Sequence, residues 1–284
     1  RRKLQKSFRS LEQAANLCLI ALALSDLMFC LAVFPNMFLP DDGRYSSNDN
    51  MVAVYHLYQF FVINVFIMES TLLTVAMSLE RFVAICFPLR QDLYLTTRRT
   101  KYVIAFTVLF SVAFNVPVLF RYEITPHWGN RSAARPLYWT VEQVKIGGSH
   151  ALDNGYRWAW AVAGNFIPLI LLFYFNVCLW WKIYLSYKMR RQFHRPQQAT
   201  RSSHILTVTL VAIVVMFFIL VAPSETVLAL KNAITMEKAT GDAIEHVLNL
   251  MQTINFSVNF VLYCIISPYF RKTLKYILLC GFYN

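Results

Sequence analysis

The sequence predicts an all-α membrane protein, a transmembrane helical bundle with six spanning helices and a C-terminal amphipathic interfacial helix. Three observations predict this fold class. The 284 residues are 57% hydrophobic and only 15% charged, and the mean hydropathy is +0.44, which is more apolar than a soluble domain. Apolar runs recur along the chain, and about 20 helical residues suffice to cross a bilayer. Basic residues cluster between these runs, as the positive-inside rule describes.

The apolar runs and the charges between them fix the expected order of the helices. Eighteen of the 27 lysines and arginines fall in residues 1–9, 90–101, 182–201 and 271–275, which we assign to the cytoplasm. Both ends then lie inside, and the number of crossings is even. After Pro268, the chain has basic residues on one helical face and apolar residues on the other, which is typical of an interfacial helix. The spanning helices are expected at residues 12–39, 51–86, 100–121, 155–188, 202–231 and 242–266.

The loop at residues 122–154 is long and polar, and this topology places it outside. β-branched and aromatic residues at Tyr122–Thr125 and Tyr138–Val144 predict a β-hairpin within it. Between these stretches, Asn130-Arg131-Ser132 is an acceptor sequence for N-glycosylation. The short loops 41–50 and 232–241 lie on the same outer side.

Charge and cysteine usage exclude several classes of protein. The net charge is +12, but the basic residues do not form the continuous patch that a nucleic-acid groove needs, so nucleic acid is not expected as a partner. The six cysteines have no CxxC spacing, and neither a metal site nor a disulfide framework is indicated. We find no nucleophile–base constellation, so the protein is not expected to be an enzyme.

The stretch from Met68 to Leu89 organises the chain. A long apolar run ends in the adjacent pair Glu80-Arg81, and charges in hydrocarbon are expensive unless they face an interface or a bundle interior. Glu80-Arg81-Phe82 and the residues up to Pro88-Leu89 resemble the (D/E)R(Y/F)xAIxxPL signature of rhodopsin-like (class A) G-protein-coupled receptors. The resemblance implies a seven-helix receptor fold over residues 1–284, as a single receptor domain, and a heterotrimeric G protein as partner.

The resemblance also implies which residues couple the receptor to the G protein. Arg81 would be held by Glu80 at rest and would turn towards an opened cytoplasmic face on activation. Asn255 to Tyr263 resembles the family's NSxxNPxxY motif, with Phe260 in place of the usual proline. The residues implied in coupling and activation are Glu80, Arg81, Phe82, Pro88, Leu89, Asn259 and Tyr263.

A second implied site lies in mid-span. Leu22 to Leu27 resembles the family's LAxxD motif, and an ionisable side chain at this depth indicates a function by default. In the family this aspartate joins a sodium ion and water, and oxygen ligands suit such a hard cation. A hydrogen-bond network without an ion is the alternative. The residues of this network are Asp26, Ser70, Asn255 and Asn259.

Departures from the family pattern have consequences of their own. His56 stands where most members have a cysteine, and the loop 122–154 contains no cysteine. The disulfide that anchors this loop in the family is therefore missing, and we expect the loop to be untethered from the helix at 51–86 and more mobile. Cys280 follows the interfacial helix, where it is either palmitoylated or a packed thiol.

The number of helices also departs from the family. We find six spans, and the family has seven. One interpretation is that the first helix and the outer tail are missing from this sequence. The other is a natural six-helix protein.

The ligand class follows from a finer resemblance. The runs at residues 115–123, 166–179 and 255–263 most resemble invertebrate FMRFamide-type neuropeptide receptors. Glu225 lies in an apolar span, where it would pair either with the guanidinium of an amidated Arg-Phe peptide or internally, with His246. The residues expected to line the ligand site are Gln59, Phe60, Ile63, Asn64, Glu225, His246, Asn249 and Gln252.

The sequence therefore predicts a multi-pass receptor of the plasma membrane, with an extracellular peptide, a G protein and membrane lipid as partners. An orphan or non-signalling receptor-like protein is one alternative, because several switch residues of the family are absent. A transporter or channel is the other, because it would also explain charges within the membrane.

Overall fold

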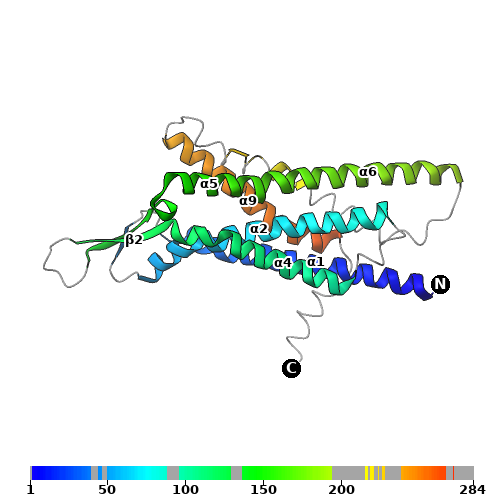
Figure 1. Ribbon diagram of the computed structural model, residues 1–284, viewed down its shortest axis with the longest axis horizontal. Helices are drawn as coiled ribbons and strands as arrows, with labels where there is room; N and C mark the ends of the chain where they lie inside the picture. The colour runs from blue at the N-terminus through cyan, green and yellow to red at the C-terminus, as the bar shows by residue number, and fades with distance from the viewer. Residues whose placement is uncertain are drawn as a thin grey trace, which may run out of the picture.

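The computed structural model is a bundle of long helices with a small β-sheet at one end (Figure 1). It describes residues 2–39, 44–46, 50–87, 96–128, 136–193, 215–216, 218–220, 223, 226–227, 238–266 and 271. The N-terminus and the end of α6 lie at the opposite end from the sheet. The charge pattern predicts this arrangement, because the basic segments at residues 1–9 and from Lys182 onward are both assigned to the cytoplasm.

The helices run through most of the described residues. Between them lie short 3-10 turns at Phe34–Met37, Val116–Phe120 and Ile146–Gly148, and a π-helical segment at Ala161–Phe166. The long elements are α1 (Arg2–Val33), α2 (Asn50–Cys86), α4 (Thr97–Asn115), α5 (His150–Trp160), α6 (Ile167–Phe193) and α9 (Lys238–Ile266).

The helices that could cross a membrane match the prediction where the structure describes them. Four stretches of the described residues are long and apolar enough: Gln13–Asn36, Met51–Cys86, Thr97–Phe120 and His150–Lys182. They correspond to the first four predicted spans. The 29 residues of α9 coincide with the predicted sixth span, although α9 is not one of these four. The predicted fifth span and the interfacial helix lie almost entirely outside the described residues.

The helix ends differ from the prediction for identifiable reasons. The first helix begins at Arg2 rather than at residue 12. Arginine and lysine have about the same helix propensity as leucine, so the helix continues through basic residues that are predicted to lie outside the membrane. It stops at Val33, where Pro35 opens a 3-10 turn. In α4, the Thr96 hydroxyl caps the first turn by accepting from Arg99 N, and α4 gives way to a 3-10 turn at Pro117.

The predicted fourth helix is a continuous rod made of α5, the π-helical segment and α6. The π-helical segment directly precedes Ile167-Pro168. Proline has no N–H and its ring collides with the preceding turn, so an α-helical register through Pro168 would lose a hydrogen bond. The wider turn accommodates this local misfit.

The outer loop forms the predicted hairpin and is held to the bundle. Strands β2 (Tyr122–His127) and β3 (Tyr138–Gln143) pair antiparallel, and β1 (Arg44–Ser46) adds to the other edge of β3. The ring of Tyr122 stacks on Phe60 of α2, with centroids 4.6 Å apart. Strand pairing and ring stacking thus hold the described part of the loop without a covalent bond where the family has a disulfide, and the greater mobility of the loop stays a prediction.

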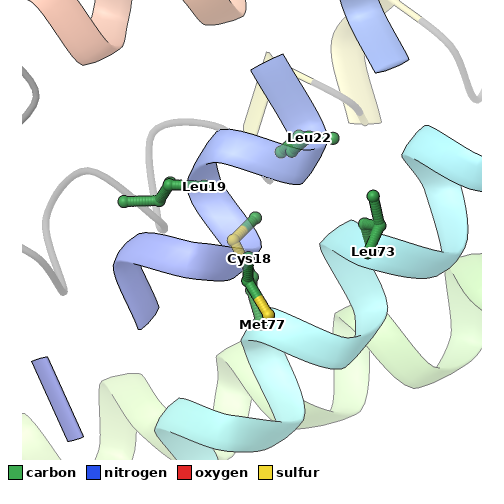
Figure 2. Close-up of a cluster of buried hydrophobic side chains, with 5 residues drawn as sticks. All are labelled: Cys18, Leu19, Leu22, Leu73 and Met77. Atoms are coloured by element: carbon green, nitrogen blue, oxygen red, sulfur yellow. The ribbon is translucent and has the colours of Figure 1, made fainter. Parts of the chain in front are cut away.

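The apolar core lies between α1 and α2. Cys18, Leu19 and Leu22 of α1 pack with Leu73 and Met77 of α2 (Figure 2). A second buried cluster, nearer the sheet, contains Phe29, Ile67 and Phe256 and thereby joins α1, α2 and α9; Ile63 and Trp160 pack against it. Removing one of these buried side chains would cost about 2–5 kcal/mol.

The polarity of α4 is reversed relative to a helix of a soluble protein. Its buried residues are polar, namely Thr100, Thr107, Ser111 and Asn115. Its large apolar side chains, such as Phe106 and Leu109, are exposed. A helix with lipid on its outer face shows this pattern, because lipid tails solvate apolar side chains and small polar residues pack between helices.

Candidate functional site

The cytoplasmic end of α2 places the predicted coupling residues in a packed environment. Arg81 is 6% exposed. Beside it, the Phe82 ring lies 5.3 Å from the ring of Phe175 and 6.0 Å from that of Tyr174, both on α6. The turn that carries Arg81 is thus held against α6 by aromatic contacts.

Glu80 has a partner that the sequence did not predict. The hydroxyl of Thr100, on α4, donates a hydrogen bond of 3.1 Å to Glu80 Oε1, and Cys18 Sγ lies 3.8 Å from the same oxygen. A helix-to-helix hydrogen bond therefore helps to position this carboxylate and joins the cytoplasmic end of α2 to α4.

Other coupling residues are only partly visible. Pro88 and Leu89 lie outside the described residues, and for Asn259 and Tyr263 the structure describes the backbone of α9 but not the side chains.

The mid-span residues of α1 and α2 come together as predicted. Asp26 is 2% exposed, and the Ser70 hydroxyl donates to Asp26 Oδ1 at 2.7 Å. Asn255 is equally buried, and its Oδ1 atom has no hydrogen-bond partner among the described residues. The rings of Phe29 and Phe256 lie 4.2 Å apart. Because Phe29 is one helical turn after Asp26, this contact brings α9 beside α1 close to Asp26. The three oxygen-bearing side chains therefore belong to adjoining turns.

The outer end of α2 holds the predicted ligand residues in two environments. Gln59 is buried and its Nε2 lies 2.8 Å from His56 Nδ1. Phe60 is 39% exposed and covered on one face by Tyr122. Ile63 packs on the Phe29–Ile67–Phe256 cluster, and Asn64 is half-buried.

The remaining predicted ligand residues belong to later helices. Gln252 is buried in α9, whereas His246 and Asn249 are exposed. Glu225 lies outside the described residues, as do Asn130 and Cys280. The choice between an internal partner and a ligand for Glu225 therefore stays a prediction.

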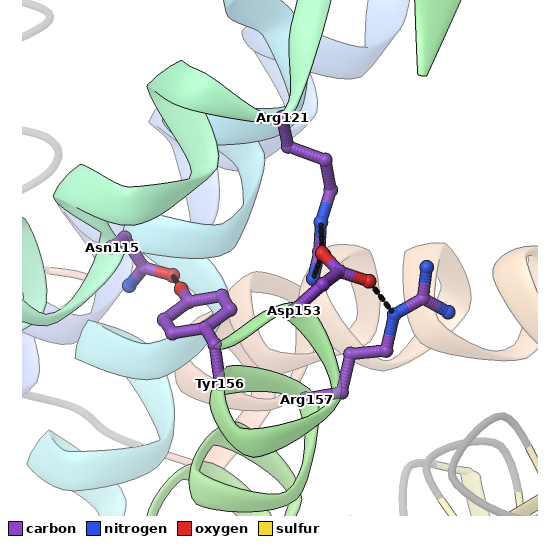
Figure 3. A network of polar contacts seen from close by, with 5 residues as sticks. All are labelled: Asn115, Arg121, Asp153, Tyr156 and Arg157. Carbon is purple, nitrogen blue, oxygen red and sulfur yellow. Dashed lines mark hydrogen bonds and ion pairs between the residues drawn. The ribbon is translucent and has the colours of Figure 1, made fainter. Parts of the chain in front are cut away.

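A polar network at the outer ends of α4 and α5 was missed by the sequence analysis. Asp153 Oδ1 accepts from Arg121 Nε and Nη2 at 3.0 and 2.9 Å, and Asp153 Oδ2 accepts from Arg157 Nε at 2.9 Å (Figure 3). The exposed fractions of the Arg121 and Asp153 side chains are 13% and 10%. The spacing of Asp153 and Arg157 by four residues was the available signal.

The same network continues inward through Asn115. Its Oδ1 accepts from Tyr156 at 3.3 Å and from Trp160 Nε1 at 3.1 Å, and its Nδ2 donates to the Ser111 carbonyl at 2.8 Å. Asn115 is completely buried. Hydrogen bonds from Tyr156 and Trp160 to Asn115 therefore join the outer end of α5 to α4.

Comparison with known families decides the class of protein. Residues 5–267 match the family model described as "7 transmembrane receptor (rhodopsin family)". The chain belongs to the rhodopsin family of seven-transmembrane receptors. This rhodopsin-family chain is therefore a multi-pass membrane protein of a receptor family, not an enzyme, and the transporter alternative is wrong.

Individual relatives are distant. The chain is 26% identical over 204 residues to the FMRFamide receptor of Drosophila melanogaster, covering 72% of this chain and 36% of that receptor. It is 24% identical over 288 residues to a probable G-protein coupled receptor of Caenorhabditis elegans, covering 93% and 62%. It is 31% identical over 117 residues to neuropeptide receptor 22 of the same nematode, covering 40% and 26%. This rhodopsin-family chain thus spans less than two thirds of the first two relatives' length.

Proposed function

We propose that this chain is the membrane-spanning part of a neuropeptide receptor, which couples an extracellular peptide of the amidated Arg-Phe type to a heterotrimeric G protein at the plasma membrane. The family match and the peptide receptors among the relatives support the proposal. The observation that carries it is the buried Arg81 at the cytoplasmic end of α2, packed beside the Phe82–Phe175 contact between α2 and α6.

Arg81 is the proposed coupling residue. A guanidinium offers five donors in a fixed fork and keeps its charge at any physiological pH. It can therefore bind backbone carbonyls of an incoming G-protein helix without a proton transfer. In this exchange Glu80 would keep its hydrogen bond to Thr100 on α4. Ligand and G protein would favour the same open state and so strengthen each other's binding.

The peptide would enter at the end of the bundle that carries the sheet. In this proposal, Phe60, Ile63 and Asn64 of α2 face it from one side and His246, Asn249 and Gln252 of α9 from another. Gln59 lies beneath, against His56. Glu225 would supply the carboxylate that pairs with the guanidinium of the peptide.

A sodium ion is a further proposed component, bound at Asp26. The residues fit this group, because Asp26 and Ser70 present two oxygens 2.7 Å apart and the buried Asn255 Oδ1 has no hydrogen-bond partner in the part of the chain that the structure describes. These three residues, with Asn259, would hold the ion, which supplies a positive charge to a carboxylate in the membrane. N-glycosylation of Asn130 and palmitoylation of Cys280 also stay proposals.

The test is nucleotide exchange on a G protein by the full-length receptor in cell membranes, with FMRFamide as ligand. Arg81→Ala should abolish the stimulated exchange and leave the Kd of FMRFamide within about threefold, because Arg81 lies at the far end of the bundle from the ligand. Arg98→Ala is the matched control, since Arg98 is an exposed arginine at the start of α4. Normal signalling by Arg81→Ala at the cell surface contradicts the mechanism. An absence of any exchange in the unmodified receptor favours the non-signalling alternative.

A further inference from the structure

Two guanidiniums surround one carboxylate at the outer end of the bundle. Arg121, Asp153 and Arg157, named here the outer arginine cluster, carry a net charge of +1. Arg121 lies just beyond the 3-10 turn that ends the α4 span, and Asp153 and Arg157 lie in α5. The charges in this cluster are only partly solvated, since the Arg121 and Asp153 side chains are 13% and 10% exposed. Within the cluster one carboxylate faces two guanidiniums, so one positive charge is left over to attract an anion.

The two arginines are bound to Asp153 unequally. Arg121 donates twice to Oδ1, through Nε and Nη2, and its guanidinium lies 5.4 Å from the centre of the Tyr156 ring. Arg157 donates once, through Nε. Its two terminal nitrogens point away from Asp153 (Figure 3) and have no hydrogen-bond partner among the described residues. The Arg157 side chain is 38% exposed, compared with 13% for Arg121.

The surroundings of Arg157 hold it in a defined position. Its helical neighbours Tyr156 and Trp160 both donate to Asn115, so the turn of α5 that carries Arg157 cannot rotate without breaking those bonds. Asp153 Oδ2 accepts from the Nε side of the fork at 2.9 Å and orients it. An arginine that is held on one side and presents a pair of parallel donors on the other is preorganised for a carboxylate, which accepts two hydrogen bonds at once.

The cluster adjoins the residues that we propose for the ligand site. Arg121 directly precedes Tyr122, whose ring stacks on Phe60. Trp160, one turn after Arg157, packs on the same buried cluster as Ile63. A molecule bound against Phe60 and Ile63 would therefore lie near the terminal nitrogens of Arg157.

We infer that Arg157 is a ligand-specificity residue, whose terminal guanidinium nitrogens bind a carboxylate of the peptide. This inference rests on the proposed function and deepens it, because it assigns the peptide an anionic group in addition to the arginine that Glu225 would pair with. The carboxylate is an acidic side chain of the peptide, because an amidated C-terminus carries none. Arg121 and Asp153 are positioning residues: they hold Arg157 and do not themselves bind the ligand.

The test compares matched synthetic peptides on the full-length receptor. The probes are Asp-Phe-Met-Arg-Phe-amide, Asn-Phe-Met-Arg-Phe-amide, FMRFamide and the free acid Phe-Met-Arg-Phe. We expect the aspartate peptide to bind about tenfold or more tightly than the asparagine peptide, the range that a charge-assisted bidentate pair provides. The free acid tests the C-terminus separately: if it binds about tenfold more tightly than FMRFamide, the amidated ligand class is wrong and the inference that rests on it falls too.

The variants assign the preference to one residue. Arg157→Gln should bring the ratio of the two Kd values to about one and leave the Kd of the uncharged peptide within about threefold. Lys145→Gln is the charge-matched control, because Lys145 is an exposed cation of the same outer face, and it should keep the tenfold ratio. If Arg157→Gln does not reach the cell surface, Arg157→Lys replaces it; it keeps the charge but loses the fork, and the ratio should fall to about threefold.

The two possible failures are distinguishable. Equal binding of charged and uncharged peptides to the unmodified receptor, or an unchanged preference in the Arg157 variant, overturns the inference and leaves the proposed function in place. If none of the four peptides binds, the Arg-Phe ligand class is wrong, and the inference falls with it.

Discussion

Asp153→Asn is the substitution with the largest expected effect at the outer end of the bundle. The amide keeps the size of the side chain but loses the charge that two guanidiniums share. Three hydrogen bonds of 2.9–3.0 Å are affected, and two positive charges then remain side by side. Breaking a buried ion pair by removing one partner costs about 3–5 kcal/mol. The retained amide oxygen can still accept one bond, so we expect a loss of about 3 kcal/mol.

The geometry predicts how this loss divides between the two arginines. Arg121 is 13% exposed and donates twice, so its coupling energy with Asp153 should be about 2 kcal/mol. Arg157 is 38% exposed and donates once at a spacing of four residues, so its coupling should be about 0.5 kcal/mol. A hydrogen bond that water can replace contributes little.

Thermal unfolding of the purified receptor in one detergent measures both terms. For a chain of this size, about 3 kcal/mol corresponds to a fall in Tm of about 6–12 °C. Double-mutant cycles of Asp153→Asn with Arg121→Gln and with Arg157→Gln give the two coupling energies. A Tm within 2 °C of the unmodified receptor, or equal coupling energies, would refute the argument from exposure and bond number.

Three further changes test other parts of the structure. Glu69→Gln should raise the Tm by about 2–4 °C, because Glu69 is 7% exposed in mid-span and its carboxylate has no hydrogen bond or ion pair among the described residues; a lower Tm would mean that the charge has a stabilising partner. Phe60→Ala should cost about 1–2 kcal/mol through the lost stack on Tyr122 and speed hydrogen exchange in β2, and unchanged exchange would show that the strands hold the hairpin alone. Replacing choline by sodium should raise the Tm of the unmodified receptor but not that of Asp26→Asn, and an equal rise in both would place the ion elsewhere.

The sequence predicted features that depend on local pattern. The positions of the first four spans and the hairpin follow from hydropathy and β-propensity, and the pairing of Asp26 with Ser70 follows from the resemblance to the receptor family. The outer arginine cluster could not be predicted in the same way. Arg121 and Asp153 are separated by 32 residues, and only the folded loop brings them together. The same holds for Glu80, whose partner Thr100 lies on another helix. It also holds for Asn115, because a neutral side chain in an apolar helix does not indicate that it accepts hydrogen bonds from a second helix.

The way in which the hairpin is held has a consequence for biosynthesis. Its attachments are strand pairing to β1, the Tyr122–Phe60 stack and the Arg121–Asp153 pair next to its first strand, and the loop 122–154 contains no cysteine. None of these contacts needs an oxidant or an isomerase to form. The outer face should therefore assemble correctly in a reducing cell-free translation system supplied with detergent or lipid, and dithiothreitol should leave its ligand affinity unchanged. Each of these contacts is non-covalent and therefore reversible, so the outer face can rearrange around the proposed peptide ligand without any covalent chemistry.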